Sequence, residues 1–288
     1  MPKTILASLT GLGSDHTVLE SAVALARIEG GHVCGLHTRI DILETAALIE
    51  TASPRQNFSP QDLLQKISSQ EDTRSRHARR AFEEACTRHA LGVRDTPVKD
   101  APSLSAEWKE NRSFLNETLH EARYHDVTVM RRDEELSSER IVSVLMQSGR
   151  PLLLAPLRPT QVIGRRVAIA WKPVAEAARA VTAASFILSR AEEVVILYVA
   201  EDENPEHSRA SAEHLAAQLA WQGIRAEVRL AGSRGVTTSQ ALLDAACEGD
   251  ADLLVAGAYG HSRMREFIFG GVTRDLLQAS ALPLFMLR

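Results

Sequence analysis

The C-terminal half of the chain alternates short apolar runs with longer segments of helical period. We expect strands at Arg166–Trp171, Glu193–Val199, Ala226–Leu230, Asp252–Ala256 and Leu282–Leu287. We expect helices at about Glu176–Arg190, Pro205–Gln222, Thr237–Glu248 and Val272–Ser280. Strands joined by helices of about ten or more residues predict right-handed crossovers, and therefore a mostly parallel sheet with helices on both faces.

The N-terminal half opens and closes in the same way, which indicates an internal repeat. Its apolar runs and its first helical segment are at Thr4–Leu9, His16–Glu29, His32–His37, Val127–Met130 and Arg150–Ala155. We therefore expect two modules, residues 1–157 and 165–288, with a polar link around 156–164. Extra residues at about 38–73 of the first module predict an insertion that bears short helices.

The composition excludes several classes of protein. A formal net charge of −4, with no block of Lys or Arg, argues against a nucleic-acid surface. No run approaches the roughly 18 apolar residues of a membrane span, and the apolar part of the N-terminus is too short for a secretion signal. Cys34, Cys86 and Cys247 are isolated in apolar patterns, which indicates reduced packing residues rather than a disulfide set or a metal site. We expect a cytoplasmic protein.

Glycines concentrate where the apolar run 251–256 meets the last helix. They are Gly257, Gly260, Gly270 and Gly271. Glycine permits positive φ and a close approach of the backbone, and the start of the following helix offers free N–H groups, so this stretch predicts a site for a phosphate-bearing ligand. The structural alternative is a helix cap, a tight turn or close helix packing, each of which can require glycine without any ligand.

These residues resemble the universal stress protein family. Gly257, Gly260 and Gly270 match the family signature G-x2-G-x9-G, and Gly271 occupies the position at which the family has Ser or Thr. The whole chain is similar to a tandem member with one divergent and one motif-bearing module. The resemblance implies two tandem five-stranded, mostly parallel open sheets with helices on both faces, an α/β fold of the Rossmann-like, adenine-nucleotide hydrolase-like type.

The resemblance also implies ATP, with Mg²⁺ if it is bound, across the C-terminal ends of the second module's strands. The base would lie near Ala170, Val199 and Ala256, beside Tyr259, and the phosphates would lie at the start of the last helix. The binding residues that we predict are Ala170, Trp171, Lys172, Val199, Ala256, Gly257, Tyr259, Gly260, Gly270, Gly271, Val272 and Thr273. We predict no catalytic and no metal-binding residues. The first module has Arg131–Glu135 in place of the glycines, so we expect it to bind no nucleotide.

Two positions depart from the family pattern. Lys172 stands where nucleotide-binding members have a carboxylate, so a donor replaces an acceptor, and Gly271 lacks the hydroxyl but keeps its N–H. Three classes of function therefore stay open. They are a stress-associated binding protein for ATP or another small anion, a nucleotide-free interaction scaffold, and an ATP hydrolase, which we rank last. The family pairs its fifth strand across a two-fold axis, which predicts an internal pseudo-dimer and allows a homodimer; the protein partners are not specified by the sequence.

Overall fold

A computed structural model describes residues 3–39, 60–97, 104–112, 117–131, 138–200, 205–232, 235–259 and 271–288. Within these residues, the strands of the first half are β1 (Thr4–Leu9), β2 (His32–Arg39), β3 (Gly92–Val93), β4 (Ser105–Arg112), β5 (Val127–Met130) and β6 (Leu152–Leu154). Those of the second half are β7 (Arg166–Ala170), β8 (Glu193–Tyr198), β9 (Glu227–Leu230), β10 (Leu253–Gly257) and β11 (Leu284–Leu287).

These eleven strands form one continuous sheet in the order β3-β4-β2-β1-β5-β6-β11-β10-β7-β8-β9. Nine of the ten neighbouring pairs are parallel, and the exception is the antiparallel pair of β6 with β11. The predicted α/β fold class is confirmed. It needs two corrections: the halves share one sheet instead of forming two, and the first half contributes the additional two-residue strand β3.

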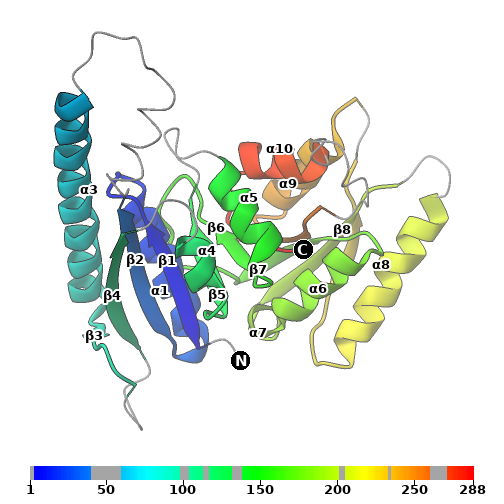
Figure 1. The fold of residues 1–288 in the computed structure, drawn as a ribbon. Coiled ribbons are helices and arrows are strands. Elements are labelled where there is room, and N and C mark those ends of the chain that lie inside the picture. The colour runs from blue at the N-terminus through cyan, green and yellow to red at the C-terminus, as the bar shows by residue number, and fades with distance from the viewer. Residues whose placement is uncertain are drawn as a thin grey trace.

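Helices cover both faces of the sheet (Figure 1). The described helices are α1 (Asp15–Glu29), α3 (Pro60–His89), α4 (Glu117–Ala122), α5 (Ser138–Gln147), α6 (Ala175–Ala183), α7 (Ser185–Leu188), α8 (Pro205–Ala220), α9 (Thr238–Glu248) and α10 (Gly271–Ala279). One hydrophobic cluster includes buried side chains of α1, α3, α6, α7 and α8. A second cluster includes those of α4, α5, α9 and α10. None of the described helices combines the length and apolar character that crossing a membrane requires.

The seam between the two halves is the antiparallel pair β6–β11. Phe285 lies opposite Leu153, and Met286 lies opposite Leu152. All four side chains are fully buried. The ring of Phe285 also meets that of Phe186 edge-on, with centroids 6.4 Å apart. A buried, hydrogen-bonded seam makes the two sheet halves one structural unit.

The prediction of short helices at about 38–73 is wrong over the described residues 60–73. They form the first part of α3, a single helix of 30 residues; the remainder of the predicted insertion, 40–59, lies outside the described residues. Ala78, Phe82 and Ala85 are buried at helical spacing, which gives α3 one apolar stripe against the sheet. Ion pairs such as Arg79–Glu83, at 3.0 Å, support its exposed face.

Strand β4 was not predicted, because its sequence is strongly charged. Ala106 is fully buried and Trp108 packs against the same core as α3, whereas Glu107 and Lys109 point to the opposite face of the sheet. A strand that has an apolar position only at every second residue, and charges between, does not form an apolar run. Two smaller corrections follow from the described helices: the helix expected at Glu176–Arg190 is divided at Ala184 into α6 and α7, and Cys247, expected to be a packing residue, is exposed.

An aspartate precedes the strand β5 in the first half and β10 in the second, and each holds the start of its half. The carboxylate of Asp126 accepts the N–H groups of Lys3 and Thr4 at 2.7 and 3.0 Å. That of Asp252 accepts the N–H groups of Gly164, Arg165 and Arg166 at 2.7 to 3.2 Å. The internal repeat therefore extends to the side chains that join each first strand to its neighbour.

Asp126→Asn is expected to lower the free energy of unfolding at pH 7 by about 1–3 kcal/mol, because charged acceptors hold N–H groups more strongly than an amide does. Burial raises the pKa of Asp126, but the donors of Lys3 and Thr4 and the charge of Arg150 outweigh it, and the pKa lies below its ordinary value. The stabilisation is therefore present above that ordinary value and is lost as the pH falls through the lowered pKa.

Urea unfolding curves at neutral and acid pH measure this difference. The two proteins should differ at pH 7 and converge below the lowered pKa of Asp126. Asp250→Asn is the control: its side chain is 81% exposed, and its φ of 49° is in the left-handed region that Asn tolerates. An equal loss of stability in both variants would contradict the prediction.

Candidate functional site

Four of the predicted base-binding residues lie together at the C-terminal ends of the strands. Ala170 ends β7, Val199 follows β8, Ala256 is in β10 and Tyr259 follows it. Ala256 is a buried member of the cluster beneath α9 and α10, and the other three are half-buried and pack against it. The sheet thus presents a partly exposed apolar surface, at the end where open parallel sheets bind ligands.

The chain turns at Tyr259 rather than at Gly257. Tyr259 has a φ of 57°, in the left-handed region that a bulky residue rarely adopts. Its N–H donates to the hydroxyl oxygen of Thr273 at 3.2 Å, which joins the end of β10 to the first turn of α10. Strain of this kind persists where the surroundings hold it, and it concentrates at binding sites.

The first turn of α10 has the features of an anion site. Gly271 and Val272 are exposed, Thr273 is buried, and the first turn carries no acidic side chain. The first N–H groups of a helix have no partner within the helix, and the helix dipole places positive charge there. A Cβ atom at Gly271 would meet no atom of the described residues within 4 Å. Gly260 and Gly270 lie outside the described residues.

Gly257 has a structural reason to be glycine. A Cβ atom on Gly257 would come within 2.5 Å of the backbone nitrogen of Ala177 and 2.7 Å of the carbonyl carbon of Glu176. The beginning of α6 therefore packs directly on the backbone of β10. Close helix packing, the structural alternative for these glycines, therefore explains Gly257 without any ligand.

Trp171 does not lie with Ala170, Val199, Ala256 and Tyr259 on the α9–α10 face. The indole N–H of Trp171 donates to the hydroxyl of Ser211 on α8 at 3.0 Å, and the ring packs against the cluster on the opposite face of the sheet. Lys172 is exposed in the tight turn before α6, where its carbonyl accepts the N–H of Val174 at 2.7 Å.

Asp275, near the start of α10, has a structural partner. Its carboxylate accepts the hydroxyl of Ser239 on α9 at 3.0 Å, which fixes the two helices together. The sequence carried no sign of this contact, nor of the left-handed Tyr259, because both depend on the packing of α9 and α10 over β10.

Burial raises the pKa of the Tyr259 hydroxyl, so this side chain is a neutral donor at physiological pH.

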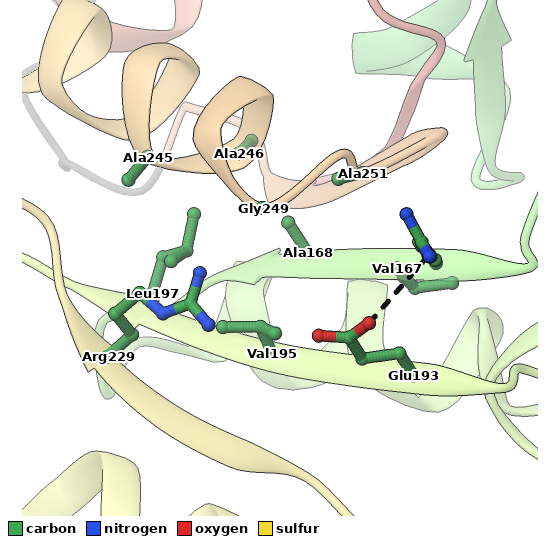
Figure 2. Close-up of a pocket in the computed structure, with 11 residues that line it drawn as sticks. Val167, Ala168, Glu193, Val195, Leu197, Arg229, Ala245, Ala246, Gly249 and Ala251 are labelled. Atoms are coloured by element: carbon green, nitrogen blue, oxygen red, sulfur yellow. Dashed lines mark ion pairs between the residues drawn. The ribbon is translucent and has the colours of Figure 1, made fainter.

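A small pocket of the second half lies at the other end of the strands, beneath the C-terminal end of α9 (Figure 2). Its volume of ≈ 10 Å³ is enough for about one water molecule. An ion pair between Arg166 and Glu193, at 3.8 Å, crosses it at the beginning of β7 and β8. This pocket is too small for a nucleotide and is remote from the start of α10.

Comparison with known proteins identifies this half of the chain. Residues 165–288 match the model of the universal stress protein family. They form a universal stress protein domain. The resemblance drawn from Gly257, Gly260 and Gly270 is confirmed for this segment, and membership makes the protein stress-associated. No curated protein sequence is significantly similar to the chain.

Three solved structures share the fold of the whole chain. A universal stress protein from Archaeoglobus fulgidus DSM 4304 has a TM-score of 0.65 at 16% identity, over 99% of this chain and 96% of that chain. A protein of Pseudomonas aeruginosa UCBPP-PA14, provisionally named a universal stress protein, has a TM-score of 0.57 at 12% identity, over 99% and 93%. A protein of unknown function from Pseudomonas aeruginosa PAO1 has the same TM-score and identity, over 99% and 92%. Both halves therefore have the fold that these proteins share.

Proposed function

We propose that the universal stress protein domain is a cytoplasmic binding module for ATP or a related anionic small molecule, with Mg²⁺ accompanying a nucleoside triphosphate. The observation that carries this proposal is the 3.2 Å hydrogen bond from the N–H of Tyr259 to the hydroxyl of Thr273. It holds the positive end of α10 against the end of β10. A phosphate at that point meets backbone N–H donors that are already in place.

The apolar surface beside α10 suits a base. Ala170 and Val199 are half-buried at the ends of adjacent strands, and small aliphatic side chains leave room for a flat ring with backbone groups at its edge. Lys172 is exposed and follows β7 by two residues, so it brings positive charge to the same end of the strands, where a carboxylate would repel an anion. The charge arrangement supports a ligand with several negative charges.

The alternative is a nucleotide-free interaction scaffold. The buried β6–β11 seam favours it, because that seam joins the halves into a single framework without any ligand. An ATP hydrolase has less support: Asp275 is engaged with Ser239, and among the described residues the cluster of three potential metal ligands is in the first half.

The first experiment asks whether any nucleotide is bound. The purified protein is denatured, and the released small molecules are identified by mass spectrometry. Thermal unfolding of a second, native sample of the purified protein is then measured with ATP, ADP and AMP, each with and without Mg²⁺. We expect copurified nucleotide or a rise in melting temperature that saturates with ATP, as linkage requires for a ligand of the native state. Absence of both at millimolar ATP would favour the scaffold.

Gly271→Asp is expected to weaken ATP binding at least about tenfold, equivalent to roughly 1.4 kcal/mol. The new carboxylate places negative charge at the phosphate position and accepts the N–H groups that a phosphate needs. The position has room for a side chain, and an acidic residue in the first turn stabilises a helix, so the fold should persist. Isothermal titration calorimetry with ATP measures the change.

Gly271→Ser is the matched control. It fills the same open position with a neutral donor and should bind ATP at least as tightly as the unchanged protein. Equal affinities of the Asp and Ser variants would show that the start of α10 is not the phosphate site.

A further inference from the structure

Three metal-ligand side chains from distant parts of the sequence meet in the first half. Cys34 is in β2, Glu107 is in β4, and His125 lies between α4 and β5. One ligand atom of each, the thiol sulfur, a carboxylate oxygen and a ring nitrogen, lies within 4.8 Å of the other two. Cys34 is fully buried and His125 is 5% exposed, whereas Glu107 is half-buried, so the cluster opens to solvent on the Glu107 side.

The sheet itself aligns two of these residues. The parallel register of β2 and β4 pairs Cys34 directly with Glu107, so both side chains leave the same face of the sheet. That face is the one covered by α4, whose Leu119 and Ala122 share a hydrophobic cluster with Cys34. The chain returns from α4 to β5 over this face and brings His125 to the pair.

The hydrogen bond of His125 prepares its ring to bind a metal. Its Nδ1 is 2.8 Å from the carbonyl oxygen of Glu121. A carbonyl only accepts, so Nδ1 is the donor of this hydrogen bond, and Nε2 is the nitrogen through which the ring can bind a metal. Metal-binding histidines typically donate their other N–H to a carbonyl or a carboxylate, which fixes the tautomer and the orientation of the ring.

The cluster also contains a cation, Lys109. Its ammonium is 3.3 Å from a carboxylate oxygen of Glu107 and 3.2 Å from one of Glu121. Lys109 has two acidic partners and is 35% exposed, so it can release Glu107 and keep its ion pair with Glu121. Glu107 also lies 3.7 Å from the Nε2 of His32, so its carboxylate is shared between two basic side chains beside Cys34 and His125.

We propose that Cys34, Glu107 and His125 form a Zn²⁺ site, with a water molecule in the fourth position. Thiolate, carboxylate and imidazole together are ligands that Zn²⁺ accepts, whereas Mg²⁺ and Ca²⁺ require oxygen ligands. Zn²⁺ replaces the thiol proton of Cys34, which goes to solvent, and the resulting thiolate and the Glu107 carboxylate balance its charge. Tetrahedral bonds of about 2.0–2.3 Å place ligand atoms roughly 3.5 Å apart, so small side-chain rotations complete the site.

The test measures metal uptake by the full chain after treatment with a chelator. The variants are made in a Cys247→Ser background, because that thiol is exposed. Zn²⁺ is titrated against a chromophoric chelator, and Co²⁺ is used as a spectroscopic probe of sulfur ligation. We expect one equivalent of Zn²⁺, a thiolate-to-cobalt charge-transfer band, and a higher melting temperature in the presence of Zn²⁺.

Cys34→Ser and His125→Gln should each weaken Zn²⁺ binding by at least about 100-fold. Loss of a residue that only orients a metal ligand weakens binding by up to about 100-fold, and loss of a ligand itself should cost at least as much. Cys86→Ser is the matched control, since Cys86 is a second buried thiol of the same half and is not in the cluster. It should keep the affinity and the cobalt band. Where circular dichroism shows that a buried variant is unfolded, half-buried Glu107→Gln provides the comparison.

Three results would overturn the proposal. They are the absence of stoichiometric Zn²⁺ uptake by the folded protein, a cobalt complex without the thiolate band, and unchanged affinity in any folded variant of the three ligands. The outcome is independent of the ATP experiments. The metal measurements use no nucleotide, and the three ligands lie in the first half of the chain, whereas the proposed ATP site lies in the second.

Discussion

Replacement of Phe285 with alanine is expected to lower the free energy of unfolding by about 3–5 kcal/mol, the range for removal of a buried aromatic side chain. Phe285 is fully buried in β11, the strand that pairs with β10 on one side and with β6 of the other half on its second side. The substitution also removes the edge-on contact between the rings of Phe285 and Phe186, whose centroids are 6.4 Å apart. The cavity therefore opens where the two halves meet, and we expect both halves to become less stable together.

Guanidinium unfolding followed by tryptophan fluorescence measures this effect. Trp108 reports on the first half and Trp171 on the second. Variants in which only one of these two tryptophans is kept allow the two signals to be measured separately. Trp221→Ala is the control, because this side chain is 88% exposed and its loss should change stability by less than about 0.5 kcal/mol. A loss confined to the Trp171 signal would show that the β6–β11 seam does not couple the halves.

Gly257→Ala is expected to destabilise the protein by about 3 kcal/mol or more, although it adds only one methyl group. The new Cβ would lie 2.5 Å from the backbone nitrogen of Ala177. Overpacking in a well-packed interior typically costs about 1–3 kcal/mol, and here the neighbour is backbone, which cannot rotate away. The beginning of α6 has to move, and with it the turn that carries Lys172.

Gly271→Ala is the matched substitution within the same motif. Its Cβ meets no atom of the described part of the chain within 4 Å, and alanine favours the helix, so stability should be unchanged or slightly higher. Thermal unfolding in the absence of any ligand compares the two variants. If Gly257→Ala has the stability of the unchanged protein, the glycine is not explained by packing, and its role beside a ligand becomes the better explanation.

Helix packing and ligand binding therefore concern different glycines of one motif. Gly257 is required by a neighbouring helix, whereas a Cβ atom at Gly271, at the start of α10, would have no close neighbour among the described residues. From sequence the two look alike, because a missing side chain gives no indication of what would occupy its place. The turn is made by Tyr259, a residue whose sequence neighbours give no sign of its φ of 57°.

The sequence by itself determined the parallel α/β fold, the internal repeat and the family of residues 165–288. Apolar runs and helical periods are local signals, and each strand that is buried on both faces is marked by an apolar run in its own sequence. Ala170, Val199, Ala256 and Tyr259 lie at one end of the strands, since parallel strands all end at the same edge.

Only the tertiary structure decided which surfaces these elements share. Charged β4 is a strand because its backbone pairs with that of β2, and the indole of Trp171 faces α8 because Ser211 is there. The union of the halves through β6 and β11, and the meeting of Cys34 with Glu107 and His125, depend on strand order and register. Contacts between residues far apart in the chain follow from packing and not from local periodicity, and for that reason the pattern of hydrophobic and polar positions does not contain them.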